Sequence, residues 1–398
     1  MGNCIQNLSE NVILVAKSDT WIEGKAIQQL NKTAELNGMI RAAGMPDLHP
    51  GRGYPIGAAF LTQGKIYPAL VGNDIGCGMG LWSTDIKVRK VNLDKFTKRL
   101  AHIDAPLDDS WNDYRSKRMS EKGLAPTSFD SALGTIGGGN HFAELQQLDE
   151  VYDDECLKQF AIDKNHLVLL VHSGSRGLGQ SILRQHVEAF GHAGLTSSTE
   201  AFHSYMLNHN AAVTFAELNR ELIALRMLKS LSAKGNNLLD VNHNLVTRFE
   251  SSSAVNSHEN LTSEGNVDLW VHRKGATPAD QGLVMIPGSR GDYSYLVKPL
   301  VESEQSRTCL HSLAHGAGRK WIRSDCKARL SKRFKKSDLE RTQFGSRVIC
   351  KHSELIFEEA SEAYKSIDSV IAAMQDGGLI QSIARFKPVL TYKTSGGC

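Results

Sequence analysis

Glycine-rich motifs recur along the whole chain and limit how it can fold. They lie at residues 51–57, 72–80, 134–139, 174–179, 288–291 and 316–318. Glycine adopts positive φ and lets the backbone approach a ligand closely, so such motifs are typical of shaped turns between regular elements. No linker-like segment separates them. We therefore predict an α+β fold, with a single large mixed α/β domain spanning residues 1–398.

Apolar patterns between the glycine motifs predict the regular elements. Short runs of branched apolar residues at 12–15 and 167–171 are typical of buried strands, and 267–273 is strand-like. Residues 199–231 place apolar side chains three and four positions apart, which predicts a long helix. A second helical region is expected around residues 357–376.

Residues 45–57 are expected to be an irregular loop. They contain three prolines and three glycines, and proline removes a backbone donor while glycine favours turns. The glycines at 137–139 fit neither the Walker pattern nor a dinucleotide-binding fingerprint in its strand–turn–helix context. A P-loop or Rossmann fold is therefore not expected.

Charge and cysteine content limit which cellular compartment and which partners are expected. The formal net charge of +3 and the pI near 8.4 permit a polyanionic partner without requiring one. The seven cysteines are odd in number and scattered, with no CxxC pair, which favours a reducing compartment. We see neither a secretory signal nor an apolar run long enough to cross a bilayer. A cytoplasmic protein is expected.

Five residues are candidate metal ligands. Asp74 and Cys77 stand three positions apart in a glycine-dense loop, where both side chains can converge on one ion. His141, His172 and His243 each end a strand-like or glycine-rich segment. A carboxylate, a thiolate and imidazoles suit Mn²⁺ or Zn²⁺ better than Mg²⁺, and two neighbouring ions can share such a set. Each residue singly is also compatible with ordinary packing.

His315 is the candidate for covalent chemistry. It stands between small residues, followed by Gly316 and Gly318, with Arg319 four positions later. A histidine in such a turn can be a nucleophile, a base or a metal ligand, and arginine offers a fork for phosphate oxygens. A tight turn with an inert buried histidine is the alternative.

Several polar residues in glycine-flanked turns are candidates for phosphate or base contacts. Backbone N–H groups in such turns can also face an anion, although Ser and Asn populate ordinary turns too. From residue 319 to residue 336 the chain carries nine basic residues against one acidic residue, Asp325. This basic run is equally compatible with a phosphate backbone or a solvated helix face. The turn candidates are Asn140, Arg176, Ser289, Ser294 and Arg319.

Taken together, the motifs resemble the RtcB-type RNA ligases, the GTP-dependent enzymes of tRNA splicing and RNA repair. Their order and content match from about residue 40 to residue 393. The motifs that carry the resemblance lie at residues 46–49, 55–57, 74–77, 134–142, 172–179, 243–244, 272–276, 287–289, 315–319, 359–360, 363–365 and 393.

The resemblance implies an unusual mixed α/β fold and a role for each candidate. It implies two Mn²⁺ ions held by Asp74, Cys77, His141, His172 and His243, and His315 as the histidine that takes GMP from GTP. It implies an RNA substrate with a 3′-phosphate or 2′,3′-cyclic phosphate and a 5′-hydroxyl end, and it leaves open whether an archease-type activator is needed. The residues implied around the nucleotide are Asn140, Glu144, Ser289, Ser294, Arg319 and Lys393, with Asp47 beside the active site and Arg176 on the phosphates.

The chain departs from the family pattern at three places. Arg290 stands where the family usually has methionine, Ser361 replaces a proline, and five residues follow Lys393 where the family commonly stops. These departures favour a divergent RNA-repair branch. Two other functions stay open from the sequence: a metal-dependent phosphoesterase that has lost ligation, and a non-catalytic RNA-binding protein that uses the basic run.

Overall fold

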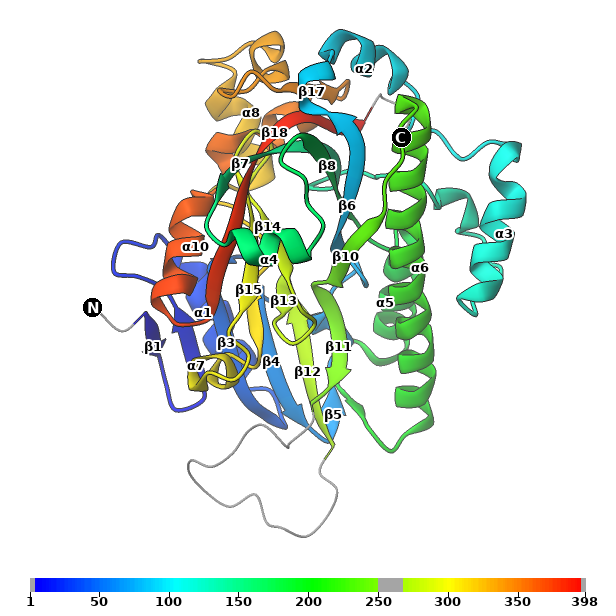
Figure 1. Cartoon of the computed structure of the whole chain (residues 1–398). Coiled ribbons are helices and arrows are strands. Elements are labelled where there is room, and N and C mark those ends of the chain that lie inside the picture. Colours follow the sequence, from blue (N-terminus) through cyan, green and yellow to red (C-terminus); the bar gives the residue numbers. More distant parts are fainter. Residues whose placement is uncertain (1–3, 250–267, 395–398) are drawn as a thin grey trace.

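The computed structural model describes residues 4–249 and 268–394. Two curved sheets lie side by side, with helices on their outer faces (Figure 1). The mixed α/β class is as expected, and the prediction of one domain over residues 1–398 stays a prediction. Among the described residues no helix is both long and apolar enough to span a bilayer. The six cysteines in this part of the chain all carry free thiols.

The first sheet is built mainly from the N-terminal part of the chain. Its order is β1-β2-β3-β4-β12-β11, in which only β2 and β3 run parallel. The apolar run that predicts a strand at 12–15 is β2, and all four of its residues are buried. The strands are β1 (Ile5–Asn7), β2 (Val12–Val15), β3 (Met39–His49), β4 (Ile56–Gln63), β11 (Asn244–Arg248) and β12 (Leu269–Lys274).

The second sheet carries most of the site described below. Its path is β10-β6-β8-β7-β18-β15-β14, and β17 pairs with β18 in parallel. The predicted buried strand at 167–171 lies within β8, between β6 and β7. The strands are β6 (Gly78–Lys87), β7 (Phe142–Val151), β8 (His166–Ser173), β10 (Asn237–Asn242), β14 (Val284–Pro287), β15 (Ser294–Pro299), β17 (Arg347–Cys350) and β18 (Ile380–Thr394).

Two short ladders complete the strands. β5 (Lys65–Ile66) pairs with β9 (Leu195–Thr196), and β13 (Ala276–Pro278) pairs with β16 (Ser312–Ala314). The β13–β16 ladder lies close to the end of β10, because Ala276 N–H donates to the His243 carbonyl at 3.1 Å. The ladder thereby joins the C-terminal part of the chain to the second sheet.

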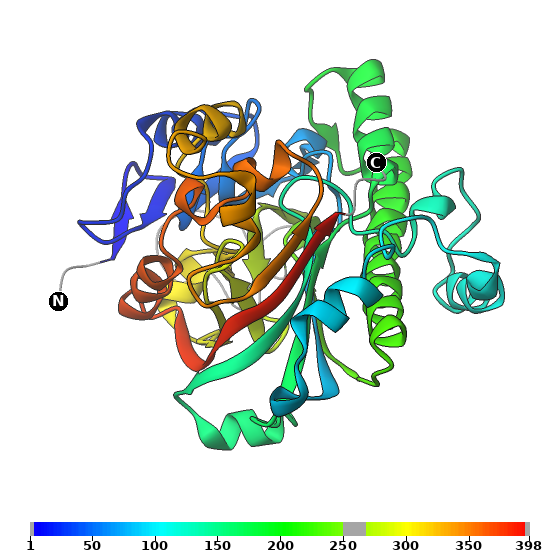
Figure 2. The same ribbon diagram turned by 90° about the horizontal axis from the view of Figure 1, so that it is seen from above.

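Helix α6 (Glu200–Leu231) confirms the long helix predicted from the spacing of apolar residues. It runs along the second sheet (Figures 1 and 2) and buries Ile223 and Met227 against β8. The Thr199 hydroxyl caps its first turn, and it ends at Ser232 with φ 56°. The other helices are α1 (Gly24–Ala34), α2 (Leu93–Arg99), α3 (Asn112–Glu121), α4 (Asp154–Gln159), α5 (Gly177–Phe190), α7 (Glu304–Thr308), α8 (Arg323–Leu330), α9 (Leu355–Glu358) and α10 (Ile367–Asp376).

The expected loop at 45–57 is partly wrong. Strand β3 continues through Pro46 to His49, and β4 begins at Ile56. The irregularity is a register shift between Gly44 and His49 in the β3–β4 ladder, so Pro46 stands where its missing N–H breaks no regular ladder bond. Only residues 50–55 between the two strands lack regular structure.

The expected helical region at 357–376 is also partly wrong. Helix α9 ends at Glu358, and α10 begins only at Ile367. The chain between them turns to form an isolated bridge between Tyr364 and Arg319, and Ala363 accepts a backbone bond from Lys320. A continuous helix would remove these contacts. The strand expected from 267 begins, within the described residues, at Leu269.

Candidate functional site

The antiparallel register of the second sheet gathers four of the candidate ligands at one edge. Strands β6 and β7 begin at that edge, while β8 and β10 end there. Cys77 immediately precedes β6 and His141 immediately precedes β7. His172 is the last residue but one of β8, and His243 directly follows β10. Residues up to 166 positions apart in sequence thus become neighbours through strand pairing alone.

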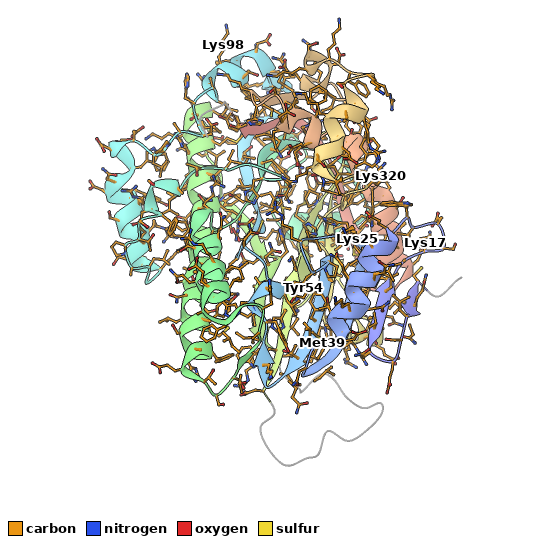
Figure 3. All side chains as sticks on the ribbon, turned by 180° about the vertical axis from the view of Figure 1, so that it is seen from behind. Lys17, Lys25, Met39, Tyr54, Lys98 and Lys320 are labelled. Atoms are coloured by element: carbon orange, nitrogen blue, oxygen red, sulfur yellow. The ribbon has the colours of Figure 1, made fainter. Side chains whose placement is uncertain are left out.

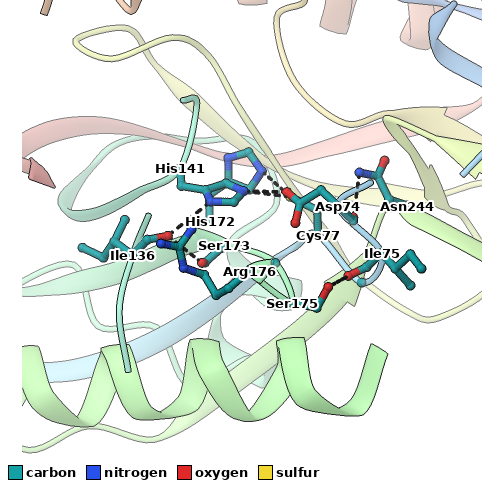
Figure 4. A network of polar contacts seen from close by, with 12 residues as sticks. Asp74, Ile75, Cys77, Ile136, His141, His172, Ser173, Ser175, Arg176 and Asn244 are labelled. Atoms are coloured by element: carbon teal, nitrogen blue, oxygen red, sulfur yellow. Dashed lines mark hydrogen bonds and ion pairs between the residues drawn. The ribbon is translucent and has the colours of Figure 1, made fainter. Parts of the chain in front are cut away.

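The gathered side chains form two groups that share Cys77. The donor atoms of Cys77, His172 and His243 lie within 4.8 Å of one another, as do those of Asp74, Cys77 and His141. Cys77 Sγ lies 3.2 Å from Nε2 of His172 and 3.4 Å from Nε2 of His141. Asp74 Oδ2 lies 2.8 Å from Nε2 of His141 (Figure 4). The structure therefore brings together all five predicted ligands.

Local hydrogen bonds orient these imidazoles. His141 Nδ1 lies 3.2 Å from the Ile136 carbonyl, which leaves Nε2 directed at Asp74 and Cys77. A histidine ligand commonly donates its second ring nitrogen to such a backbone carbonyl. The Nδ1 atom of His243 is buried and has no hydrogen-bond partner within the described residues. An unpaired buried nitrogen of this kind is what a missing cation would satisfy.

A close backbone approach fixes the position of Asp74. A Cβ atom added to Gly174 would lie 2.1 Å from Oδ1 of Asp74, so only glycine leaves room for this carboxylate. The Asn244 amide donates to the Asp74 carbonyl at 3.0 Å and its oxygen accepts from the Gly275 N–H at 2.7 Å. The Asp74 loop is therefore held from the β8 side and from the β11 side.

The electrostatics of the cluster favour a cation. Burial lowers the pKa of His172 and His243 well below the usual histidine value, so both imidazoles are neutral and their lone pairs are available. Burial raises the pKa of the Cys77 thiol, and the carboxylate of Asp74 raises it further. Burial alone would raise the pKa of Asp74, but His141 brings it below its usual value. A bound divalent cation would convert the thiol to the thiolate.

Arg220 of helix α6 connects the loops that carry these ligands. Its guanidinium is fully buried and forms a two-pronged ion pair with Asp240, with Nε 2.9 Å from Oδ2. It also donates to the carbonyls of Gly76 and Ser173, each at 2.8 Å, and to the side chain of Asn242 at 2.7 Å. Each of these three acceptors stands next in sequence to a candidate ligand. One side chain therefore fixes three ligand segments relative to each other.

Replacing Arg220 with methionine is expected to lower the free energy of unfolding by about 3–5 kcal/mol, because Asp240 is left buried without its partner. Mn²⁺ affinity should fall roughly 10- to 100-fold, since the ligand segments lose their common support. Urea unfolding and equilibrium dialysis measure the two effects. Arg184→Met is the matched control, because its pair with Glu188 is exposed and should contribute little. Unchanged metal affinity in the Arg220 variant would contradict the positioning role.

His315 follows strand β16 and lies beside the cluster of candidate metal ligands. The rings of His315 and His243 are 4.9 Å apart between centroids. Nδ1 of His315 lies 2.6 Å from Oδ2 of Asp47, and its backbone N–H donates to the same oxygen at 3.3 Å. The carboxylate stands beside Nδ1, so Nε2 is the ring nitrogen left to face a substrate. The predicted proximity of Asp47 to the active site agrees with this geometry.

Two residues hold Asp47 in place. The buried ammonium of Lys365 donates to the carbonyls on either side of Asp47, those of Pro46 at 2.9 Å and Leu48 at 2.8 Å. Gly318 has φ 70°, and a Cβ atom there would lie 2.2 Å from the Asp47 carbonyl oxygen. Glycine at position 318, three residues after His315, is therefore required by this close approach.

Glu144 lies at the centre of a buried polar network between β7, β18 and β15. The Gln146 amide donates to Oε1 of Glu144 at 2.7 Å and to the Ser294 hydroxyl at 2.8 Å. The Thr391 hydroxyl donates to the other carboxylate oxygen. Burial raises the pKa of Glu144 to about 7, although these donors partly oppose the shift. Two of the predicted nucleotide contacts, Glu144 and Ser294, are thus joined by one amide.

Lys393 and Arg319 meet at a residue to which the sequence assigned no role, Glu359. Its buried carboxylate lies 3.6 Å from Nζ of Lys393, 3.2 Å from Nη1 of Arg319 and 3.6 Å from Nη2 of Arg323. Burial alone would raise the pKa of Glu359, but these cations and the Tyr364 hydroxyl lower it to about 2. Burial lowers the pKa of Lys393 to about 8 against the attraction of Glu359. Arg319 is therefore held by protein groups.

Arg176 lies against a different segment, the glycine motif at residues 134–139. It begins helix α5 with φ 58°, and a Cβ atom on Gly137 would lie 1.7 Å from its Nη1. Arg176, Gly137, Thr135 and Lys393 contribute to the wall of a pocket of about 240 Å³. The backbone of the glycine motif and one guanidinium thus face the same space.

The remaining candidates and the basic run lie around these groups. Asn140 is half-buried next to His141, and the Ser289 hydroxyl is buried without a partner within the described residues. In the basic run, Trp321 lies under Arg329 at 5.1 Å and beside Lys320 at 6.0 Å, and Lys320 faces the rear of the molecule (Figure 3). Its exposed cations are Arg323, Lys327, Arg329, Lys332, Arg333 and Lys335.

Comparison with known proteins gives full-length similarities. A family model described as tRNA-splicing ligase RtcB matches residues 29–125 and 108–394. An RNA-splicing ligase RtcB2 from Escherichia coli is 52% identical over 397 residues, which cover 100% of this chain and 99% of that protein. A tRNA-splicing ligase RtcB from Nanoarchaeum equitans is 29% identical, with 97% of this chain and 94% of that protein covered. The RNA-splicing ligase RtcB of E. coli K12 is 28% identical, with 94% and 95% covered.

Proposed function

The chain belongs to the tRNA-splicing ligase RtcB family, and from this membership we propose that it is an RNA ligase. It joins an RNA 3′-phosphate end, or a 2′,3′-cyclic phosphate end after ring opening, to a 5′-hydroxyl end. GTP is the co-substrate and Mn²⁺ the metal. The observation that carries the proposal is the position of His315, which is oriented by Asp47 and lies beside a five-ligand cluster.

The first step is transfer of GMP to the protein. Asp47 keeps the proton of His315 on Nδ1, so the lone pair of Nε2 attacks the α-phosphorus of GTP. The bond from that phosphorus to the bridging oxygen breaks, and pyrophosphate leaves with the electron pair. The product is a phosphoramidate between His315 and GMP. Arg176 is placed to stabilise the negative charge on the phosphates.

Two Mn²⁺ ions would be held by Asp74, Cys77, His141, His172 and His243, of which Cys77 belongs to both groups of donors. The residues fit this metal, because a thiolate, imidazoles and one carboxylate suit a borderline divalent cation, and the Nδ1 of His243 has no other partner within the described residues. When bound, the metal withdraws negative charge from the phosphate oxygens around the α-phosphorus that is attacked.

The base is bound at the other end of the site. The Glu144 carboxyl group lies between Gln146 and Thr391. There the carboxyl group can accept hydrogen bonds from the N–H groups of guanine. Lys393, Ser294, Ser289 and Asn140 complete this end of the pocket in our proposal. We infer from its surroundings that Arg319 places Glu359 and Tyr364 and does not itself bind phosphate.

Two further transfers complete the reaction. The GMP moves from His315 to an RNA 3′-phosphate and forms a 3′,5′ diphosphate bridge to guanosine. The RNA 5′-hydroxyl then attacks the activated 3′-phosphate, and GMP leaves as a phosphodiester forms. Cytoplasmic location, tRNA splicing or repair as the pathway, and an archease-type activator remain predictions.

Ligation of defined RNA ends tests the proposed function. One RNA carries a 3′-phosphate and the other a 5′-hydroxyl, and the expected result is a joined product that requires both GTP and Mn²⁺. RNAs with a 3′-hydroxyl and a 5′-phosphate are the matched control and should stay separate. Cleavage of the phosphate without joining would identify a phosphoesterase. Binding of RNA without either reaction would identify a non-catalytic RNA-binding protein.

A further inference from the structure

Arg290 is a buried cation with two nitrogen atoms that are unpaired among the described residues. It lies in the turn between β14 and β15 and is 9% exposed. Within residues 4–249 and 268–394, its Nε and Nη1 atoms find no hydrogen-bond partner, and neither does the hydroxyl of the adjacent Ser289. Burial lowers the pKa of Arg290, although the charge of Glu359 partly opposes the shift. Such a group is costly to bury unless a ligand satisfies it.

The surrounding protein does not neutralise this charge. Glu359 is the buried carboxylate of this region, and it already pairs with Arg319, Arg323 and Lys393. Arg290 is therefore a fourth cation beside Glu359, and Glu362 is the second carboxylate that acts on it. The region has an excess of positive charge and free donors, which is the complement of an electron-rich ligand.

The turn that carries Arg290 lies between His315 and the Glu144 network. A Cβ atom on Gly316, next to His315, would lie 3.0 Å from the Pro287 carbonyl at the end of β14. Strand β15 begins on the other side of the turn with Ser294, which belongs to the Glu144 network. The charged neighbours that act most strongly on Arg290 include Glu359 and none of the candidate metal ligands. The turn therefore connects the His315 end of the site to the Ser294 and Glu144 network, which would face the base.

We propose that Arg290 binds the O6 and N7 acceptors of the guanine base that enters with the nucleotide, and that it strengthens selection for guanine. The proposal rests on the proposed function, because it assumes that His315 receives GMP. Arginine pairs with the O6 and N7 atoms of guanine through two N–H groups. Adenine presents an amino donor in place of O6, so a second arginine N–H has no acceptor there.

This contact would distinguish the chain from family members that have methionine at this position. Arg290 stands where the family that the sequence resembles usually has methionine, and a thioether offers no donor. Arg290→Met therefore removes the proposed contact. The methionine that it introduces is a side chain that suits this fold. Because it also removes a buried unpaired cation, the variant is expected to melt at or above the wild-type temperature.

Calorimetric binding of GMP and of 7-deaza-GMP, which lacks the N7 acceptor, tests the proposal on the full chain with Mn²⁺. Arg290→Met should bind GMP roughly 10- to 100-fold more weakly than wild type. Wild type should lose affinity on the change from GMP to 7-deaza-GMP, whereas Arg290→Met should bind both alike. Arg184→Met, on the exposed side of α5, is the control and should resemble wild type.

Three results would overturn the proposal. Equal weakening of GMP and 7-deaza-GMP by Arg290→Met would place the arginine on the phosphate or ribose. Unchanged GMP binding would show that no ligand contact exists, and a large drop in melting temperature would give Arg290 a structural role. Protein labelling by α-labelled GTP is scored separately. If wild type takes no label while the calorimetry behaves as expected, the proposed function fails and the guanine contact stands.

Discussion

Replacing His315 with alanine is expected to abolish both the labelling of the protein by α-labelled GTP and the joining of RNA ends, on the order of 10³-fold or more. The imidazole lies beside Asp47 and the candidate metal ligands, and in our proposal its Nε2 is the atom that takes GMP. The measurement is acid-labile label retained on the protein in the presence of Mn²⁺. His203→Ala, an exposed histidine of α6, is the control.

The same variant separates a nucleophile from a metal ligand. If His315 only carries GMP, His315→Ala should still bind Mn²⁺ with wild-type stoichiometry. It should also seal an RNA whose 3′-phosphate has already been joined to GMP, because that step requires only the 5′-hydroxyl and the activated end. Wild-type labelling of His315→Ala would refute the assignment. Loss of a metal ion together with the sealing step would show that His315 is a sixth ligand.

The elements and the ligands differ in how far the sequence could predict them. The buried strand around residues 167–171 and the helix at 199–231 follow from local apolar patterns, which the structure confirms. The ligand set could be predicted from its glycine motifs together with the family resemblance. Its convergence depends on which strands pair and in what register, a tertiary property that no local pattern contains.

The polar supports of the site could not be predicted for a related reason. Arg220 and Gln146 lie within a helix and a strand, where a single polar residue is compatible with solvent exposure. The one available signal is that Arg220 falls four residues after the buried Ala216 and four before the buried Ala224, and therefore in the apolar stripe of α6. A charged residue in such a stripe is a candidate for a buried pair.

In the irregular segments, local sequence patterns predict a feature but not its exact form. Proline and glycine correctly predict a break at residues 45–57, but the break combines a register shift inside the paired strands with a loop confined to residues 50–55. At residues 359–364 the helical pattern was overridden because Glu359 and Tyr364 turn toward Arg319. In both places the departure from regular structure positions a residue of the site, Asp47 in the first and Glu359 in the second.

Removing the Cys77 side chain is expected to have the largest effect on metal binding. Because Cys77 belongs to both ligand groups, Cys77→Ala should weaken both ions, roughly a hundredfold or more, since even partners behind the ligands typically contribute 10- to 100-fold. His141→Ala and His243→Ala each touch one group, so each should lower the stoichiometry from two Mn²⁺ ions to one. Equilibrium dialysis with electron paramagnetic resonance of free Mn²⁺ measures these numbers.

The comparison of the three variants decides between one shared site and two. If His141→Ala and His243→Ala each retain one ion while Cys77→Ala retains neither, the thiolate lies between two ions. If either histidine variant loses all bound Mn²⁺, the five residues form a single site. Cys309→Ala, a buried cysteine in another part of the core, is the control for loss of a buried thiol and should keep both ions. Two ions bound to Cys77→Ala at wild-type affinity would exclude the cysteine as a ligand.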